Sequence, residues 1–316
     1  MSIVAVVGSL NMDLVIRASR QPFLGETLMG RSFGTTGGGK GSNQALACAR
    51  LGAESHIIGC VGNDDFGVRL RSSLTEGKVN CGHLEVSGTA GTGVAVITVT
   101  DQGDNAIVLA PGANACLDAK AVERAAEVFK KADAALFQLE VPLEAVRAGL
   151  ALARATGCRT VLTPAPAQEL PSTVWPLVDY VVLNETELAF YASGNASGAS
   201  KTSERLDVDA VRKAARRLLA AGTKGVVVTR GAQGGVAVTE RADFCYPSFA
   251  VNAVDSTGAG DAFCAALIVG LSDGMSLEQA ARFASAAGAL ACTRFGAHPS
   301  LPWRHEVEAL LERDDT

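Results

Sequence analysis

Charged residues are sparse in this chain of 316 residues, since they make up 19% of it and the net charge is −5 with no block of lysine and arginine. Without a basic block the chain lacks the electrostatic footprint of a protein that binds nucleic acid or an anionic membrane. It also lacks an N-terminal basic segment followed by an apolar one, and any apolar run long enough to span a bilayer. We therefore expect a cytoplasmic protein.

Cysteine and histidine also lack the spacing of a reactive site. The eight cysteines form no CxxC pair and have no close histidine at zinc spacing. The four histidines are scattered without a serine or cysteine partner, so a hydrolytic triad has no support. No G-x-G-x-x-G turn follows the first apolar run, which disfavours a dehydrogenase. With 48% hydrophobic residues the chain can build a large core, so a disulfide framework is not expected.

Short apolar runs alternate with longer helical patterns along the chain. Strands are predicted at residues 3–7, 134–139, 160–162, 180–183 and 226–229, and helices at 119–131, 143–155, 208–221, 277–293 and 304–311. This alternation predicts an α/β fold of three layers, α/β/α, around a mainly parallel sheet. We expect one domain over residues 1–316, with a flexible loop at 193–200 and ligands beyond the carboxyl ends of the strands.

Two segments break this alternation, residues 14–17 with 28–33 and residues 93–110. The second predicts a hairpin with a turn at 101–105. Its residues Val94, Val96 and Thr98 share one face, and Ala95, Ile97 and Val99 share the other. Both faces are mostly apolar, which is unusual for an isolated surface hairpin. The hairpin either packs on the main core or forms a small β-sheet lid, with one face over the substrate and the other against a second subunit.

The most informative motif is Asp255-Ser256-Thr257-Gly258-Ala259-Gly260-Asp261-Ala262-Phe263, a glycine-rich turn that leads into a helix predicted at 262–271. The start of a helix presents unpaired N–H groups to an anion such as a phosphate, and Gly258 and Gly260 let the backbone approach it closely. Asp261 is ionised at neutral pH and can accept a proton from a hydroxyl. An anion cradle beside a base predicts phosphotransfer. A capped helix after a turn is the simpler alternative.

A second glycine-rich turn, Gly37-Gly38-Gly39-Lys40-Gly41-Ser42-Asn43-Gln44-Ala45, precedes a helix predicted at 43–50. It nearly makes a Walker A loop, but position 41 is glycine and no strand is expected directly before it, so we reject a P-loop. Lys40 and Asn43 can instead hydrogen-bond sugar hydroxyls.

Asn11 and Asp13 follow the first strand, where α/β folds place ligand contacts. An aspartate there can accept from two vicinal hydroxyls of a furanose. An Asx turn is the alternative for this pair.

These two motifs resemble the signatures of the PfkB-type sugar kinases, and the resemblance runs from residue 7 to residue 304. It implies an ATP-dependent kinase that converts D-ribose to D-ribose 5-phosphate, with Mg²⁺, K⁺ as an activator, and a homodimer built on a lid of residues 12–36 and 93–110. Another acceptor (2-deoxyribose, a hexose or adenosine) stays open, as does a non-catalytic sugar-binding regulator.

The resemblance also implies the site residues. Catalysis would fall to Asp261 as base with the backbone of Gly258, Ala259 and Gly260. Sugar contacts would be Asn11, Met12, Asp13, Gly39, Lys40, Gly41, Ser42, Asn43, Glu140 and Asp261. Nucleotide contacts would be Asn184, Thr229, Arg230, Gly231, Ala232, Gln233, Gly234, Gly260 and Ser285. Glu187 would hold magnesium through water, and the potassium loop would comprise Asp255, Thr257, Ala291, Arg294, Gly296 and Ser300. Thr163 departs from the asparagine common in the family.

Plain structural roles compete with several of these assignments. Acidic residues such as Glu187 are favourable in a first helical turn without any metal. The glycine loop at 229–234 could be an ordinary hairpin turn. Asp255 could merely cap its turn, and Gly296 could merely end a helix.

Overall fold

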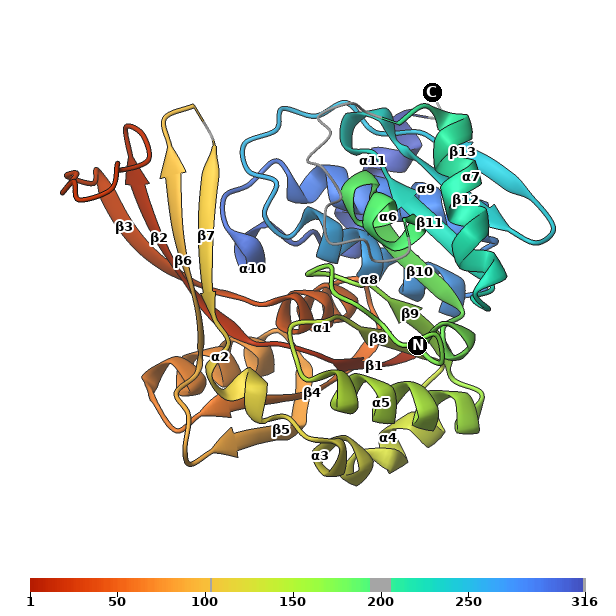
Figure 1. Cartoon of the computed structure of the whole chain (residues 1–316), viewed down its shortest axis with the longest axis horizontal. Coiled ribbons are helices and arrows are strands. Elements are labelled where there is room, and N and C mark those ends of the chain that lie inside the picture. The colour runs from red at the N-terminus through yellow and green to blue at the C-terminus, as the bar shows by residue number, and fades with distance from the viewer. Residues whose placement is uncertain (103, 194–205, 315–316) are drawn as a thin grey trace.

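A nine-stranded sheet forms the centre of the molecule, in the order β13-β12-β11-β10-β9-β8-β1-β4-β5 (Figure 1). Its strands are β1 Ile3–Val7, β4 Glu54–Gly62, β5 Val79–Ser87, β8 Ala134–Phe137, β9 Arg159–Leu162, β10 Tyr180–Asn184, β11 Gly225–Thr229, β12 Gly235–Thr239 and β13 Asp243–Tyr246. All neighbours are parallel except β11–β12 and β12–β13. The predicted mainly parallel sheet is confirmed. This computed structural model describes residues 1–102, 104–193 and 206–314, so most of the loop predicted at 193–200 lies outside it.

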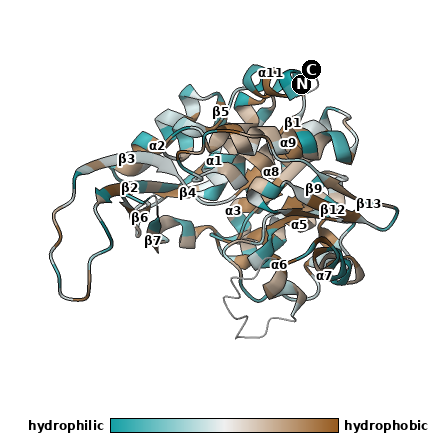
Figure 2. Ribbon diagram, turned by 90° about the horizontal axis from the view of Figure 1, so that it is seen from above, coloured by the Kyte–Doolittle hydropathy of each residue, from teal (hydrophilic) through white to brown (hydrophobic). Residues whose placement is uncertain are grey.

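Helices cover both faces of this sheet. Successive residues of a strand point to opposite sides, and the strands are apolar on both sides, so each face needs a covering layer. Val4 and Val6 of β1 join one core cluster, whereas Ala5 and Val7 join the other. The first face is covered by α1 Lys40–Arg50, α2 Asp65–Glu76, α8 Ala259–Ser272, α9 Leu277–Ala291 and α11 Arg304–Asp314. The second is covered by α3 Ala119–Arg124, α4 Ala126–Lys131, α5 Leu143–Thr156, α6 Glu185–Ala192 and α7 Val208–Ala220. Figure 2 shows hydrophobic residues along strands of the sheet and on α8, whereas α7 and α11 carry much hydrophilic surface.

A separate four-stranded sheet, in the order β3-β2-β6-β7, extends to one side of the molecule (Figure 1). Its strands are β2 Asn11–Ala18, β3 Ser32–Gly38, β6 Gly93–Thr100 and β7 Asn105–Ala110. The predicted hairpin is confirmed as β6 and β7, which pair antiparallel. No strand was expected directly before Lys40, and residues 28–33 were expected only to break the alternation of strands and helices. The chain stays paired with β2 as far as Gly38, opposite Asn11, so a strand does lie directly before Lys40.

Other boundaries differ from expectation in informative ways. The helix predicted at 119–131 is two helices, because the backbone of Ala125 turns to φ −90° and ψ 11°. No element was assigned to residues 54–87, which hold β4, α2 and β5. The eight cysteines are all free thiols. Among the described residues no helix is long and apolar enough to cross a membrane.

Candidate active site

Polar residues from distant parts of the chain gather where several strands of the central sheet end. Asn11 follows β1, Glu140 follows β8, and Asn184 closes β10. The starts of α1 and α8 face the same region, because these two helices pack together on one side of the sheet. Carboxyl ends of parallel strands are where open α/β folds bind ligands, so the residues predicted from the sequence do gather at an edge of that kind.

Asp261 lies in the first turn of α8 with its carboxylate 8% exposed. The helix begins earlier than predicted because Gly258 adopts φ 80°, a left-handed conformation that suits glycine, and ends the turn. Both oxygens accept amide hydrogen bonds, Oδ2 from Asn43 Nδ2 at 2.8 Å and Oδ1 from Gln44 Nε2 at 3.0 Å. Burial raises the pKa of Asp261, while Lys40 and the two amides oppose that rise. The carboxylate is therefore held ready to accept a proton.

Open backbone donors stand beside this carboxylate. Among the described residues, the amides of Gly258, Gly260 and Asp261 have no hydrogen-bond acceptor, whereas Ala259 N donates to Ser256 O at 3.2 Å. A Cβ on Gly260 would meet nothing within 4 Å. The helix start thus presents unpaired donors to free space, as an anion site requires.

Lys40, Glu140 and Ser9 form a polar cluster close to Asp261. Ser9 Oγ donates to Glu140 Oε2 at 2.6 Å, and Lys40 Nζ lies 3.8 Å from Glu140 Oε1. Burial would lower the pKa of Lys40, but the carboxylates of Asp261, Glu140 and Glu187 outweigh it and raise that pKa. Lys40 therefore stays cationic and neutralises part of an acidic pocket.

Asp13 lies at the base of β2, and the chain makes room for its carboxylate. A Cβ on Gly38 would lie 2.2 Å from Asp13 Oδ2. No donor among the described residues bonds this carboxylate. Burial, together with the charges of Glu140 and Asp261, raises the pKa of Asp13 to about 7. A buried carboxylate without a donor fits a place for ligand hydroxyls.

The side-chain amides of Asn11 and Asn43 complete this wall of the pocket. Asn11 Oδ1 accepts from Asn114 Nδ2 at 2.8 Å, and Asn114 Oδ1 also accepts from Leu10 N at 2.8 Å. Asn43 Oδ1 is buried with no partner among the described residues. Buried polar atoms are rarely left unpaired, so this oxygen is available to a ligand.

Met12 and Ser42 take supporting positions in the structure. Met12 is 2% exposed in the core, and Ser42 is fully buried. Ser42 Oγ bonds the Gly38 carbonyl at 2.5 Å and His298 Nε2 at 3.0 Å. Burial, with a smaller effect of Arg50, lowers the pKa of His298 to about 4, so this ring is neutral at neutral pH. Met12 and Ser42 thus support the glycine turn from the core side, and neither makes a polar contact with the Asp13 carboxylate.

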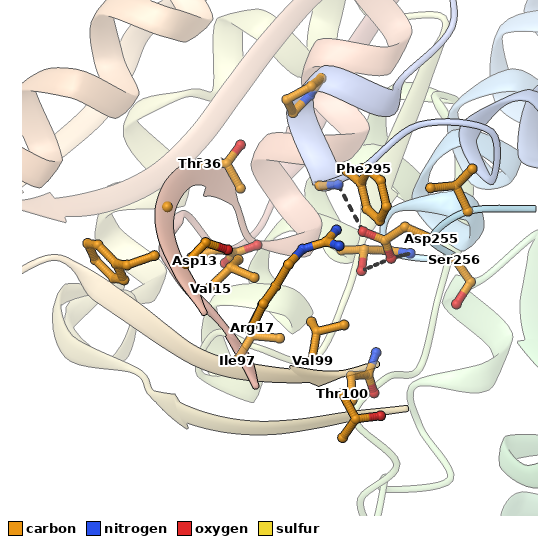
Figure 3. Close-up of a pocket in the computed structure, with 18 of the residues that line it drawn as sticks. Asp13, Val15, Arg17, Thr36, Ile97, Val99, Thr100, Asp255, Ser256 and Phe295 are labelled. Atoms are coloured by element: carbon orange, nitrogen blue, oxygen red, sulfur yellow. Dashed lines mark hydrogen bonds between the residues drawn. The ribbon is translucent and has the colours of Figure 1, made fainter. Parts of the chain in front are cut away.

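A cavity of about 800 Å³ opens beside Asp13, between the small sheet and the loops at residues 253–257 and 295–299 (Figure 3). Val15 and Ile97 line its sheet side, and Asp255 lines the opposite side. The Arg17 guanidinium reaches across the cavity to lie 4.0 Å from the centre of the Phe295 ring. The small sheet thus covers the space next to the polar cluster.

The predicted nucleotide residues form a second group, at the ends of β10 and β11. Arg230 turns away from the loop it begins, with Nε 3.1 Å from Glu185 Oε1. Gly231 has φ +56° with open space around it, whereas a Cβ on Gly234 would lie 2.1 Å from Tyr246 O. Ser248 Oγ bonds the Ala232 carbonyl at 2.6 Å, and Ser285 Oγ bonds the Pro247 carbonyl at 2.6 Å. Ser285 is therefore brought to the same side as the 231–234 loop.

Residues 1–304 match the pfkB family of carbohydrate kinases. The chain belongs to this family. It is 35% identical to the ribokinase of Haemophilus influenzae over 97% of both chains. It is 36% identical to a deoxyribokinase of Salmonella typhi over 82% of both chains. The structure of Arabidopsis thaliana ribokinase complexed with ribose and ATP superposes with a TM-score of 0.87 at 28% identity, covering 99% of each chain. The fold is thus ribokinase-like, and kinases of the pfkB family use ATP with Mg²⁺.

Glu187 fits the magnesium role that the pfkB family implies, although it also has a structural role. Asn184 and Glu187 form a capping box at the start of α6, with Asn184 N donating to Glu187 Oε2 at 2.9 Å. Glu187 Oε1 has no protein donor among the described residues, so it can accept from a metal-bound water. Burial raises the pKa of Glu187, opposed by the Asn184 amide and by Lys40.

The segments of the predicted potassium loop meet in space. Asp255 Oδ2 accepts from Gly296 N at 2.9 Å, and Ser300 Oγ lies 3.4 Å from the Thr257 carbonyl. Arg294 directs its side chain to Glu306, which leaves only its backbone for the loop, and Ala291 is fully buried at the end of α9. The structure thus brings Asp255, Thr257, Gly296 and Ser300 to one place, and potassium binding there stays a prediction.

Several residues of this pfkB-family site were not found from the sequence. They are Ser9, Gln44, Asn114 and Gln138, all buried polar side chains that bond the predicted residues or one another. Gln44 lies inside the second glycine-rich motif, and Ser9 lies between the first strand and Asn11. Gln138 and Asn114 carry a weaker signal, namely a polar residue next to an apolar run.

Proposed function

We propose that this kinase transfers the γ-phosphoryl group of ATP to the 5-hydroxyl of D-ribose, giving D-ribose 5-phosphate and ADP. The observation that carries the proposal is the buried carboxylate of Asp261, set beside unpaired amides at the start of α8. The same carboxylate lies near Asp13, Lys40 and Glu140, a polar set that suits a polyhydroxyl acceptor.

Each group then has a defined part in the reaction. Asp261 takes the proton of the 5-hydroxyl as that oxygen attacks phosphorus in line and the β-phosphate oxygen of ADP leaves. The amides of Gly258 and Gly260 donate to the negative charge that develops on the transferred group. Asp13, Asn11 and Asn43 hold the sugar hydroxyls. Magnesium, when bound near Glu187, neutralises phosphate charge.

We also propose that the small sheet, residues 12–36 and 93–110, is a lid over the sugar. Ala95 and Ile97 are each 5% exposed on its inner face. Closing this face over the substrate would exclude water, which competes with the sugar as acceptor.

The outer face of the lid supports a homodimer. It exposes a row of large apolar side chains, Ile16 at 37%, Phe33 at 65%, Val96 at 43% and Val108 at 73%. These residues sit opposite one another across the strands, as the pairing of Ile16 with Phe33 and of Val96 with Val108 requires. An apolar patch on such a surface is typical of a subunit interface.

The second candidate acceptor is 2-deoxyribose, because a deoxyribokinase is 36% identical to this chain over 82% of both chains. The two sugars differ by one hydroxyl, and Asp13 is suited to accept from two vicinal hydroxyls. A site built to hydrogen-bond a hydroxyl discriminates against the analogue that lacks it. We therefore favour ribose.

One assay tests the function. Phosphorylation by ATP and Mg²⁺ would be followed with ribose, 2-deoxyribose, fructose and adenosine, and the product position assigned by NMR. We expect the highest kcat/KM with ribose and phosphate on the 5-oxygen. A higher kcat/KM with another acceptor would replace ribose, and absence of any transfer would favour a non-catalytic binding protein.

A further inference from the structure

Two fully buried glutamines stand in line behind the carboxylate of Asp261. Gln44, on α1, donates from Nε2 to Asp261 Oδ1 at 3.0 Å. Gln138, directly after β8, donates from Nε2 to Gln44 Oε1 at 2.6 Å. The chain of hydrogen bonds therefore runs from the central sheet, through α1, to the first turn of α8.

The polarity of this chain is fixed by its last member. An ionised carboxylate can only accept, so Gln44 must turn its NH₂ group to Asp261. Its carbonyl then faces Gln138, which must turn its own NH₂ group toward Gln44. With either amide reversed, two acceptors would face each other inside the core.

The surroundings of Gln138 show that the position is built for this amide. A Cβ on Gly8 would lie 1.9 Å from Gln138 Oε1, so only a glycine at position 8 leaves room for the side chain. Gln138 Oε1 is itself buried without a partner among the described residues. Leaving a buried polar atom unpaired is unfavourable, and an apolar side chain there would avoid it. The amide is kept although packing alone does not call for it.

We propose that Gln44 and Gln138 are positioning residues for the reaction, which hold Asp261 in its ionised form and fix the direction in which its carboxylate points. Gln138 acts by orienting Gln44, and Gln44 acts directly on the carboxylate. This inference rests on the proposed role of Asp261 as the base.

Other charged groups also face Asp261 and set the background for a pH test. Lys40 on α1 stabilises the ionised form, whereas Glu140, after β8, opposes it. Asp13 on β2 and Cys264 on α8 are close enough to feel the charge of Asp261. None of these groups changes when Gln44 or Gln138 is replaced, so a shift in the pH profile reports the lost amide.

The test compares Gln44→Met, Gln138→Met and the parent enzyme by the pH dependence of kcat at saturating sugar and ATP. Gln44→Met removes a hydrogen bond to the charged carboxylate of Asp261. The midpoint of the acid limb of kcat should therefore move to higher pH by about one unit. Activity should then recover as pH rises, while the sugar KM stays near the parent value. Gln138→Met should shift the limb less, because Gln44 keeps its bond to Asp261.

Gln138→Glu probes the direction of the chain in a side chain of nearly unchanged shape. An ionised carboxylate at position 138 cannot donate to Gln44. It would instead attract the NH₂ group of Gln44 and turn the Gln44 carbonyl toward Asp261. We therefore expect a larger shift of the acid limb of kcat than in Gln138→Met. A role in packing alone predicts the opposite order. Thr160→Val serves as a control, since Thr160 is buried and bonds Asp179, so the change should lower the melting temperature without moving the acid limb.

An unshifted acid limb in Gln44→Met, with folding verified by circular dichroism, would overturn the proposal. So would a milder effect of Gln138→Glu than of Gln138→Met. Asp261→Asn separates this result from the proposed function. If Asp261→Asn keeps parental turnover, the base assignment fails. If it loses turnover and the Gln44→Met limb does not move, only the positioning role fails.

Discussion

At the scale of single residues, the site contains a carboxylate whose burial opposes its charge. Asp13 has no hydrogen-bond donor among the described residues, and its pKa rises to about 7 mainly because burial disfavours the ionised form. A folded-state pKa above the ordinary value of 3.8 means that ionising Asp13 destabilises the empty protein. The stability that the neutral form contributes is lost as pH rises from 3.8 to about 7. This residue is suited to binding and poorly suited to stability.

Asp13→Asn should therefore weaken the use of ribose and stabilise the protein without ligand. The parent's kcat/KM for ribose should fall as pH drops through about 7, and Asp13→Asn should have a low kcat/KM without that limb. Loss of one charge-assisted hydrogen bond predicts a ribose KM raised about tenfold or more. In calorimetry without ligand, the variant should melt higher than the parent above neutral pH. A lower melting temperature there would contradict the burial argument.

Gly260 separates the needs of the fold from those of the reaction. A Cβ at this position meets no protein atom within 4 Å, and the residue lies in the first turn of α8. Gly260→Ala should therefore keep the melting temperature, since alanine suits a helix better than glycine. The methyl group would occupy the space that the transferred phosphate needs, so kcat should fall by about 10²-fold. Unchanged kcat and ATP KM would show that no anion approaches this amide.

At the scale of elements, β3 offers a matched pair of glycines. A Cβ on Gly38 would lie 2.2 Å from Asp13 Oδ2, whereas a Cβ on Gly34 in the same strand would meet nothing within 4 Å. We expect Gly38→Ala to displace the Asp13 carboxylate and raise the ribose KM about tenfold or more. Gly34→Ala should leave the ribose KM unchanged. Equal effects of the two changes, measured in initial-rate assays, would show that strand flexibility matters and that Asp13 does not depend on Gly38.

Much of the fold, but not all of it, could be predicted from such elements. Clear patterns of hydrophobic residues located the helices α5, α7 and α9 and five strands of the central sheet, namely β1, β8, β9, β10 and β11, but not β4. The break at Ala125 carries no proline or glycine, and so no local signal. β3 was not predicted, because three of its residues are glycines with weak strand propensity, and pairing with β2 overrides that propensity.

The candidate site shows the same division. The motif residues Asp261, Lys40 and Asn43 could be chosen because residue type and spacing pointed to their chemistry. Gln138 could not, because its significance lies in a 2.6 Å contact with Gln44, 94 positions earlier in the sequence. Long-range contacts of this kind depend on how α1 packs against the sheet, which no local pattern encodes.

At the scale of the whole molecule, the outer face of the lid should decide assembly. Val108 is 73% exposed on this face, and a lysine there would place a charge in a subunit interface. We expect the parent to be a dimer in light scattering at micromolar concentration and Val108→Lys to be monomeric. Val86→Lys is the control, because Val86 is 52% exposed on β5, an edge strand of the other sheet. A monomeric parent would refute the dimer.

The potassium loop makes a prediction about the medium. We expect potassium to raise kcat several-fold over sodium at equal ionic strength, because an ion between the two segments would order the turn before Gly258. Asp255 joins these segments through Thr257 and Gly296, so Asp255→Ala should abolish the response. Equal kcat in potassium, sodium and a bulky organic cation would leave Asp255 with only its capping role.

The small sheet is attached to the rest of the molecule along one edge. The chain enters or leaves all four of its strands there, at Asn11, Gly38, Gly93 and Ala110, whereas Ala18, Ser32, Thr100 and Asn105 lie at the opposite end. We expect this sheet, as a lid, to swing about its attached edge. Asn114 pins that edge at Leu10 and Asn11. Glycines pack closely there, since a Cβ on Gly39 would lie 2.7 Å from Asn11 N and one on Gly93 would lie 2.3 Å from Asn11 Oδ1. In such a swing Asn11 and Asp13, which lie next to the attached edge, would move least. Arg17 lies further along β2 and would move more. Such a swing would open the pocket to substrates while the residues nearest the attached edge keep almost the same place.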